Sequence, residues 1–134
     1  MKDLIKSDPP CSITSPDLLY PQIRRKIKDP YKEHFLVCSL TTRNTLIAID
    51  VVSIGTLSAS LVHPRECFSI AIKRHAATII LSHNHPSGDT DPSEDDLKIT
   101  RRLVEAGKIM GIEVLDHLII TTSKYLSFKE KYLI

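Results

Sequence analysis

Residues 78–96, TIILSHNHPSGDTDPSEDD, hold the strongest structural signal in this 134-residue chain. The apolar run at 78–82 is typical of a short buried strand, and the prolines and glycine after it predict a polar loop over 83–92. Ser93 then begins the clearest helix of the chain, 93–110, which Gly111 closes. A buried strand, a polar loop and an amphipathic helix in this order predict a helix packed against a sheet.

The regions on either side extend this pattern. Runs of apolar and β-branched residues predict further strands at 35–40, 45–52, 56–62, 112–121 and 125–128. Pro64 stands at the first turn of a further helix, 65–74. One side of that helix is lined by Phe68, Ala71, Ile72 and His75. We therefore expect the α/β class, with a single mixed β-sheet flanked by helices.

The N-terminal segment, 1–30, differs from the rest, because it holds five of the eight prolines. We interpret 1–30 as an irregular, proline-rich arm with at most one short helix, at 17–28, followed by one domain over 31–134. The arm carries a basic cluster, which a solvated surface explains better than a contact with phosphates. The cluster consists of Arg24, Arg25, Lys26 and Lys28.

Composition excludes several classes of protein. With 18 basic and 16 acidic side chains, the formal net charge is +2, which excludes a nucleic-acid binder that works by bulk charge. Cys11, Cys38 and Cys67 form no C-x-x-C pair, which argues against a disulfide framework and a thiolate zinc cluster. No apolar run approaches the roughly 20 residues of a membrane helix, and no secretory signal begins the chain. We expect a cytoplasmic protein without a membrane partner.

Three side chains within residues 78–96 form a candidate metal site. His83 and His85 are two apart on an extended segment, so both imidazoles project to the same side. Asp96 lies in the first turn of the following helix, at the head of its apolar stripe. That stripe holds Ile99, Leu103, Ala106 and Met110. A carboxylate on a buried face needs a partner, which a metal held by the two histidines would supply. Two histidines and one carboxylate leave a fourth position open, as in a catalytic zinc site.

A simpler interpretation accounts for some of the same residues. Ser93-x-x-Asp96 is also a capping box, and paired histidines in polar loops are common without metal. From the residues alone both interpretations stay open. The tripeptide His83-Asn84-His85 shares only its letters with a nuclease class, and the chain contains no G-x-S-x-G, Walker or P-C-x-x-C motif.

The spacing His83-x-His85, seven residues, then Ser93-x-x-Asp96 resembles the JAMM motif of MPN/JAB-domain metalloproteases. The segments HPRECF at 63–68 and LDHLIIT at 115–121 are similar to the RadC branch of that family. The resemblance covers about residues 31–134 and implies an MPN/JAB, cytidine-deaminase-like fold. Longer RadC-like proteins carry a helix-hairpin-helix region before this domain, which the proline-rich arm here does not resemble.

The resemblance implies Zn²⁺ bound by His83, His85 and Asp96, and hydrolysis of an amide bond in a peptide or protein by a metal-activated water. Ser93 would hydrogen-bond the water or the tetrahedral oxyanion. The family also needs a general-base glutamate on an early strand, and Glu33, directly before the strand at 35–40, matches it best. Glu66, on the helix after Pro64, is the alternative candidate for the general base.

Several points stay open at this stage. Neighbours in a strand face opposite ways, so at most one of Asp116 and His117 can face the site, and either could be a core residue. We assign no metal role to His34, His63 or His75. The alternatives to a hydrolase are a DNA-repair-associated accessory module and a non-enzymatic metal-binding interaction domain. The short strand at 125–128 could pair with another chain if it lies at an edge.

Overall fold

The computed structural model describes residues 12–55 and 62–134. The helices in these ranges are α2 (Pro16–Lys26), α3 (Pro64–Lys73) and α4 (Glu94–Met110). The strands are β1 (His34–Leu40), β2 (Leu46–Ile54), β3 (Thr78–Asn84), β4 (Glu113–Ile120) and β5 (Tyr125–Ser127). The strand predicted at 56–62 falls on residues 56–61, which lie outside the described ranges. No helix within those ranges has the length and apolar composition needed to cross a membrane.

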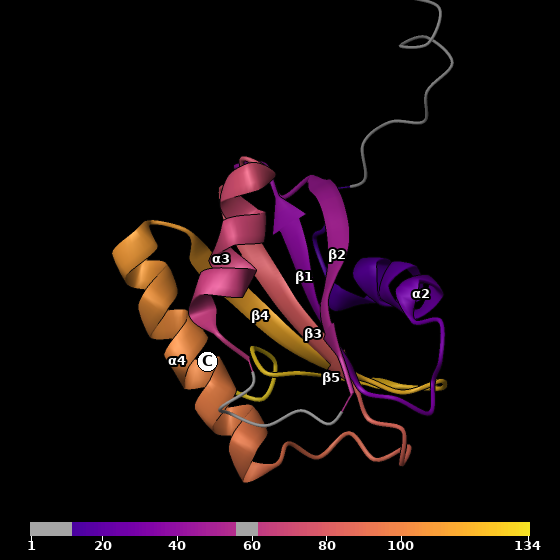
Figure 1. The fold of residues 1–134 in the computed structure, drawn as a ribbon. Helices are drawn as coiled ribbons and strands as arrows, with labels where there is room; N and C mark the ends of the chain where they lie inside the picture. Colours follow the sequence, from indigo (N-terminus) through magenta and orange to yellow (C-terminus); the bar gives the residue numbers. More distant parts are fainter. Residues whose placement is uncertain (1–11, 56–61) are drawn as a thin grey trace, which may run out of the picture.

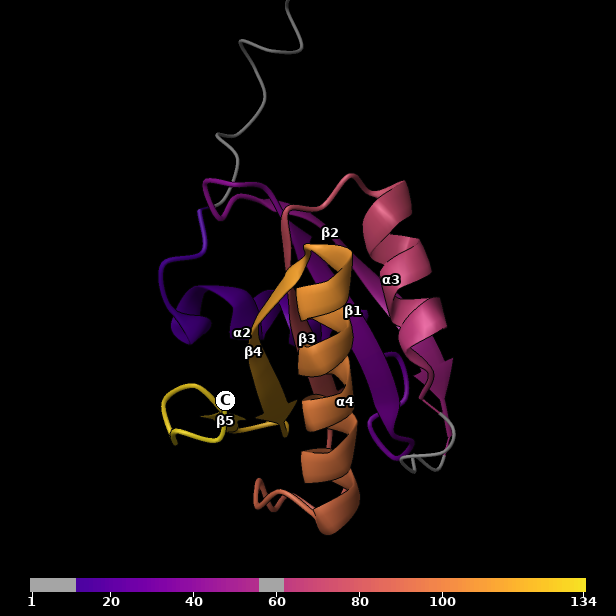
Figure 2. The same ribbon diagram turned by 90° about the vertical axis from the view of Figure 1, so that its left-hand side faces the viewer.

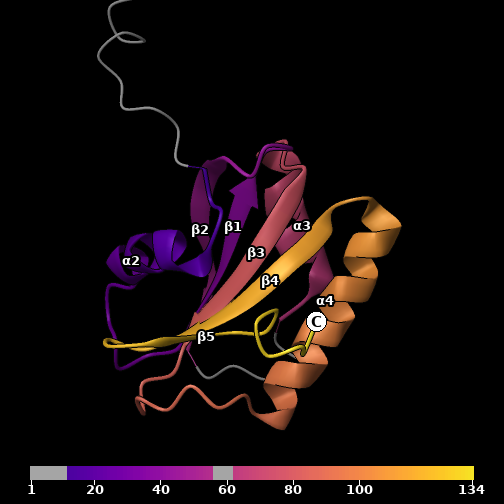
Figure 3. The ribbon, with the colours of Figure 1, turned by 180° about the vertical axis from the view of Figure 1, so that it is seen from behind.

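The strands form one mixed sheet in the order β2-β1-β3-β4-β5, which confirms the predicted fold class. Neighbouring strands are antiparallel except for β3 and β4, which run parallel. Strand β3 is central, as Figure 3 shows from behind. Phe35 of β1 and Ile119 of β4 lie opposite His83 on its two sides.

Helices cover both faces of this sheet, with α3 and α4 on one face and α2 on the other (Figure 1). Figure 2, turned so that α4 faces the viewer, shows α3 and α4 next to each other. Because side chains alternate along a strand, β1 sends Phe35 and Val37 toward α3 and α4, and Leu36 and Cys38 toward α2. Burial on both faces explains the nearly continuous apolar runs of β1 and β3.

The short helix predicted within the proline-rich arm forms as α2 and packs on the sheet. Leu19 and Ile23 are fully buried in the core on that face. The hydroxyl of Tyr20 donates to the carbonyl of Thr121 at 2.8 Å, where β4 ends. This part of the proline-rich segment therefore contributes to the hydrophobic core.

Two details differ from the sequence-based expectations. Strand β3 extends to Asn84, so His83 and Asn84 are strand residues rather than loop residues. Helix α3 buries Cys67 with Phe68 and Ala71, whereas Ile72 and His75 are exposed. His75 lies beyond the end of α3 with a positive φ of 56°, so it does not continue the helical face.

The ends of α4 agree with the predicted signals. Ser93 is the N-cap of a complete capping box, and Gly111 ends the helix in the left-handed conformation, φ 72°. Asp96, Ile99 and Leu103 are buried as predicted, whereas Met110 in the last turn is 46% exposed. The buried stripe thus begins at Asp96 and holds α4 against the sheet.

We predict that Gly107→Ala destabilises the protein. In an exposed helix this change stabilises by about 1 kcal/mol. A Cβ at Gly107 would instead lie 2.5 Å from the backbone carbonyl oxygen of Ile112, which cannot rotate away. We expect a loss of roughly 1–3 kcal/mol in the free energy of unfolding, measured with urea. Lys98→Ala, on the exposed side of α4, is the control, and unchanged or increased stability of Gly107→Ala would contradict the prediction.

Candidate metal centre

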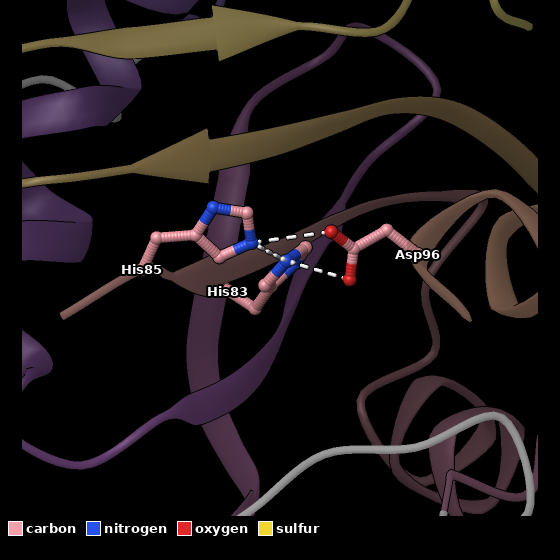
Figure 4. A group of neighbouring side chains, drawn as sticks. All are labelled: His83, His85 and Asp96. Atoms are coloured by element: carbon pink, nitrogen blue, oxygen red, sulfur yellow. Dashed lines mark hydrogen bonds and ion pairs between the residues drawn. The ribbon is translucent and has the colours of Figure 1, made fainter. Parts of the chain in front are cut away.

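Three side chains that could hold a metal ion meet where β3 ends and α4 begins (Figure 4). His83 Nε2 lies 3.0 Å from His85 Nε2 and 3.1 Å from Asp96 Oδ1, and His85 Nε2 lies 3.1 Å from Asp96 Oδ2. His83 and Asp96 are buried, whereas His85 is partly exposed at the surface of the site. Within residues 12–55 and 62–134, no other group of three such side chains converges in this way.

The donor set and its dimensions fit a divalent transition metal. Tetrahedral ligands about 2.0–2.1 Å from zinc lie about 3.3 Å from one another, close to the separations found here. Two imidazole nitrogens and one carboxylate oxygen are borderline donors that suit zinc. Three protein ligands leave one coordination position for a water or a substrate atom.

A hydrogen bond on the far side of His85 orients its ring. His85 Nδ1 lies 2.7 Å from the carbonyl oxygen of Asp89. A carbonyl can only accept, so Nδ1 carries the proton and Nε2 can present a lone pair toward His83 and Asp96. This is the tautomer that a metal ligand needs.

The electrostatics of the three groups favour an ionised carboxylate. Burial would raise the pKa of Asp96, but hydrogen bonds with His83 and His85 outweigh it and hold that pKa well below its ordinary value. The hydrogen bond with Asp96 also raises the pKa of His85. A metal cation would replace the proton that His85 shares with the carboxylate.

The capping box and the candidate metal site use the same carboxylate. Ser93 N donates to Asp96 Oδ2 at 2.8 Å, and Ser93 Oγ accepts from Asp96 N at 3.0 Å. The two interpretations left open by the sequence are therefore compatible, because Asp96 caps its own helix while it faces both histidines. The Ser93 hydroxyl proton is not used in the cap and remains available to donate.

Glu33 lies one residue before β1, and His85 lies one residue after β3. The β1–β3 pairing ends with Phe35 opposite His83, so the two residues are at the same end of the paired strands. The Phe35 and His83 rings are stacked with centroids 6.2 Å apart, which places the Phe35 side chain on the same side of the sheet as the ligands. The negative charge of Glu33 contributes to the raised pKa of His85. This placement favours Glu33 over Glu66, which lies exposed in the first turn of α3.

Asn84 holds the backbone on both sides of Glu33. Its Oδ1 accepts from His34 N at 2.7 Å, and its Nδ2 donates to the Lys32 carbonyl at 3.0 Å. The Glu33 carbonyl itself accepts from Gly55 N at 2.8 Å. Because Asn84 stands between the two histidines, the end of β3 positions both the ligands and the glutamate. Sequence reasoning gave Asn84 no role, since its partners are far from it along the chain.

Of the neighbours Asp116 and His117, the histidine faces the site. His117 Nε2 lies 2.7 Å from His83 Nδ1. Asp116 points the other way and accepts from Ser127 Oγ and from the backbone N–H of Lys129, which ties β5 and the following turn to β4. Burial lowers the pKa of His117 well below its ordinary value, because it disfavours the charged form of the ring.

A pocket of about 410 Å³ opens beside His85, on the side of α2 and the end of β4. Its lining includes Arg24, Ile27, Tyr31, His85, Pro86 and Thr121. The lining carries a guanidinium and no carboxylate, so the pocket favours neutral or anionic groups next to the candidate metal site.

The two described cysteines do not offer an alternative nucleophile. Cys38 and Cys67 are free but buried. Burial raises the pKa of Cys67 to about 12 and that of Cys38 further still. Thiols with such pKa values stay protonated near neutral pH and are inert.

The chain shares much of its sequence with known proteins. A family model described as a RadC-like JAB domain matches residues 13–133. The chain is 54% identical over 119 residues to a "UPF0758 protein" of Alkaliphilus metalliredigens, covering 89% of this chain and 51% of that protein. It is 57% identical over 103 residues to one of Moorella thermoacetica, covering 77% and 45%. It is 44% identical over 124 residues to one of Methanosarcina mazei, covering 92% and 54%. The chain spans about half the length of these curated relatives, and their names assign no activity.

We predict that Asn84→Ala lowers stability without removing metal. The change leaves the buried His34 N–H without its acceptor, which costs roughly 1–3 kcal/mol in the free energy of unfolding. Zinc content per chain should stay at the unmodified level, because both histidines and Asp96 remain. Thr122→Ala, at an exposed position after β4, is the control. Unchanged stability of Asn84→Ala in urea unfolding would show that the Lys32–His34 segment does not depend on Asn84.

Proposed function

The chain belongs to the RadC-like JAB domain family, and on this premise we propose that it is a zinc-dependent hydrolase of amide bonds. The observation that carries the proposal is the convergence of His83, His85 and Asp96 within 3.0–3.1 Å, with one coordination position left for water. Bound there, Zn²⁺ would lower the pKa of that water and polarise the scissile carbonyl.

In this proposal Glu33 is the general base. Its charge acts on His85, which supports a position near the site, where it would accept the proton of the attacking water and return it to the leaving amine. The Ser93 hydroxyl would donate to the oxyanion of the tetrahedral intermediate. Its oxygen is held by Asp96 N, which fixes the position of the hydroxyl while leaving its proton free to donate.

The substrate we propose is a segment of peptide or protein. The pocket beside His85 would hold the chain next to the scissile bond, with Ile27 and Tyr31 in its lining. The free thiols of Cys38 and Cys67 support a reducing compartment such as the cytoplasm. A DNA-associated role stays a prediction, with no contact in the site favouring it.

The first test is the zinc content of the purified chain, prepared without chelator. We expect about one zinc per chain, and little in Asp96→Ala, since removal of one of three ligands disrupts an open site. Glu94→Ala removes a negative charge from the same helical turn, but at an exposed position, and should keep its zinc. Absence of zinc from the unmodified chain, even after zinc is added, would overturn the proposed metal site.

The second test concerns Glu33. We expect Glu33→Gln to retain zinc but to lose about 10²–10⁴-fold in rate, the usual contribution of a general base. The assay is mass spectrometry of a peptide library that includes isopeptide-linked members, incubated with the zinc-loaded protein. Glu66→Gln should leave the rate unchanged. Full activity of Glu33→Gln would show that the base assignment is wrong. Loss of activity in Glu66→Gln alone would assign the role of general base to Glu66.

A further inference from the structure

A chain of three hydrogen bonds leads from His83 into the core and returns to Asp96. His83 Nδ1 lies 2.7 Å from His117 Nε2, and His117 Nδ1 lies 2.6 Å from Thr100 Oγ1. Thr100 Oγ1 in turn donates to the Asp96 carbonyl oxygen at 2.7 Å. The chain therefore begins on the ring of one candidate ligand and ends on the backbone of another.

The last acceptor determines the direction of the whole chain. The Asp96 carbonyl can only accept, so the single hydroxyl proton of Thr100 points toward it. Thr100 Oγ1 must then accept the proton of His117 Nδ1–H. The ring nitrogens of His117 are hydrogen-bonded to Thr100 and His83, and not to a carboxylate that would hold a second proton. With its one N–H on Nδ1, His117 Nε2 carries a lone pair and accepts from His83 Nδ1–H. His83 Nε2 is left with its lone pair, and it faces His85 and Asp96.

The opposite direction would be incompatible with a metal. If the Thr100 hydroxyl donated to His117 instead, each proton would move to the other end of its bond. His83 Nε2 would then carry an N–H directed at Asp96 Oδ1, 3.1 Å away, in the space between the ligands. The direction of the chain thus decides whether His83 offers a lone pair or a proton.

The surroundings of the chain keep other partners away. His117 is fully buried and Thr100 is 2% exposed. The His117 ring is stacked on Phe128, with centroids 4.7 Å apart, and meets Phe35 edge-on at 5.7 Å. These aromatic contacts hold the ring plane, and they offer no competing hydrogen-bond donor or acceptor.

We propose that His117, held by Thr100, is a positioning residue that fixes the tautomer and the ring orientation of His83 for metal binding. Partners of this kind commonly contribute 10–100-fold to metal affinity. The inference rests on the metal centre of the proposed function but not on hydrolysis, so metal affinity tests it without a substrate.

The experiment measures the zinc dissociation constant of the full chain by competition with a chromophoric chelator. Thr100→Val keeps the side-chain shape but removes the hydroxyl, and His117→Phe keeps an aromatic ring but removes the acceptor. We expect both to bind zinc about 10–100-fold more weakly. Thr100→Ser and His117→Gln keep the hydroxyl and an acceptor, and should recover most of the affinity. Ser82→Ala is the control, since it removes a buried hydroxyl that bonds β3 to β4 on the other face.

A second measurement reports the protons directly. In nitrogen-15 NMR spectra of the zinc-loaded chain, His117 should be neutral with its proton on Nδ1. A proton on His117 Nε2 would overturn the proposal, as would unchanged zinc affinity in both Thr100→Val and His117→Phe. If His117→Phe fails to fold by circular dichroism, Thr100→Val decides alone. Failure of the unmodified chain to bind zinc would reject the metal centre and this inference together. If the unmodified chain binds zinc and both Thr100→Val and His117→Phe bind it equally well, only this inference is rejected.

Discussion

The buried carboxylate of Asp96 is the constraint on which the arrangement of the site depends. A carboxylate that is removed from water must be compensated, because an unpaired buried charge is very costly. Here the backbone N–H of Ser93 donates to Asp96, and a proton or a metal held between Asp96 and the imidazoles of His83 and His85 supplies the rest. These contacts fix the first turn of α4 against the end of β3, and the apolar residues farther along α4 then pack on the sheet.

The alternation of side chains along a strand gives the end of β3 two functions. His83 and His85 face α4 and form the candidate site, while Asn84 between them turns the other way and binds the backbone around Glu33. A single central strand therefore sets the distance between the ligands and the glutamate. This is possible because β1 is paired directly with β3, which brings the backbone on both sides of Glu33 into contact with Asn84 although they are far apart in the sequence.

The sequence predicts the local parts of this arrangement and misses those set by register. Helical periodicity places Asp96 on the inner face of α4, and the capping signal places the start of that helix at Ser93. The sequence does not reveal that β3 extends through His83, or that His117 rather than Asp116 contacts His83. Both features depend on the pairing of β3 with β4 and on the irregularity between Ile79 and Ile80. Thr100 is one helical turn after Asp96 on the same face of α4. Because Asp96 is predicted to face inward, this spacing indicates that Thr100 faces inward as well. The sequence also does not predict that α2 packs on the sheet, because the prolines around it favour irregular structure.

The contacts that hold the candidate ligands do not themselves require a metal. Asp96 is fixed by its own capping box, His85 by the Asp89 carbonyl, and His83 by His117. The ligand-bearing elements are also anchored by the buried cores on both faces of the sheet. In zinc fingers and many other small zinc domains, the structural metal supplies the folding energy, and the chain is unfolded without it. Here the fold supplies the geometry in advance, so a metal at this position can keep an open coordination site and exchange its fourth ligand. An open coordination site on a geometry that the protein itself maintains is what metal-assisted hydrolysis needs, which supports the catalytic role proposed above.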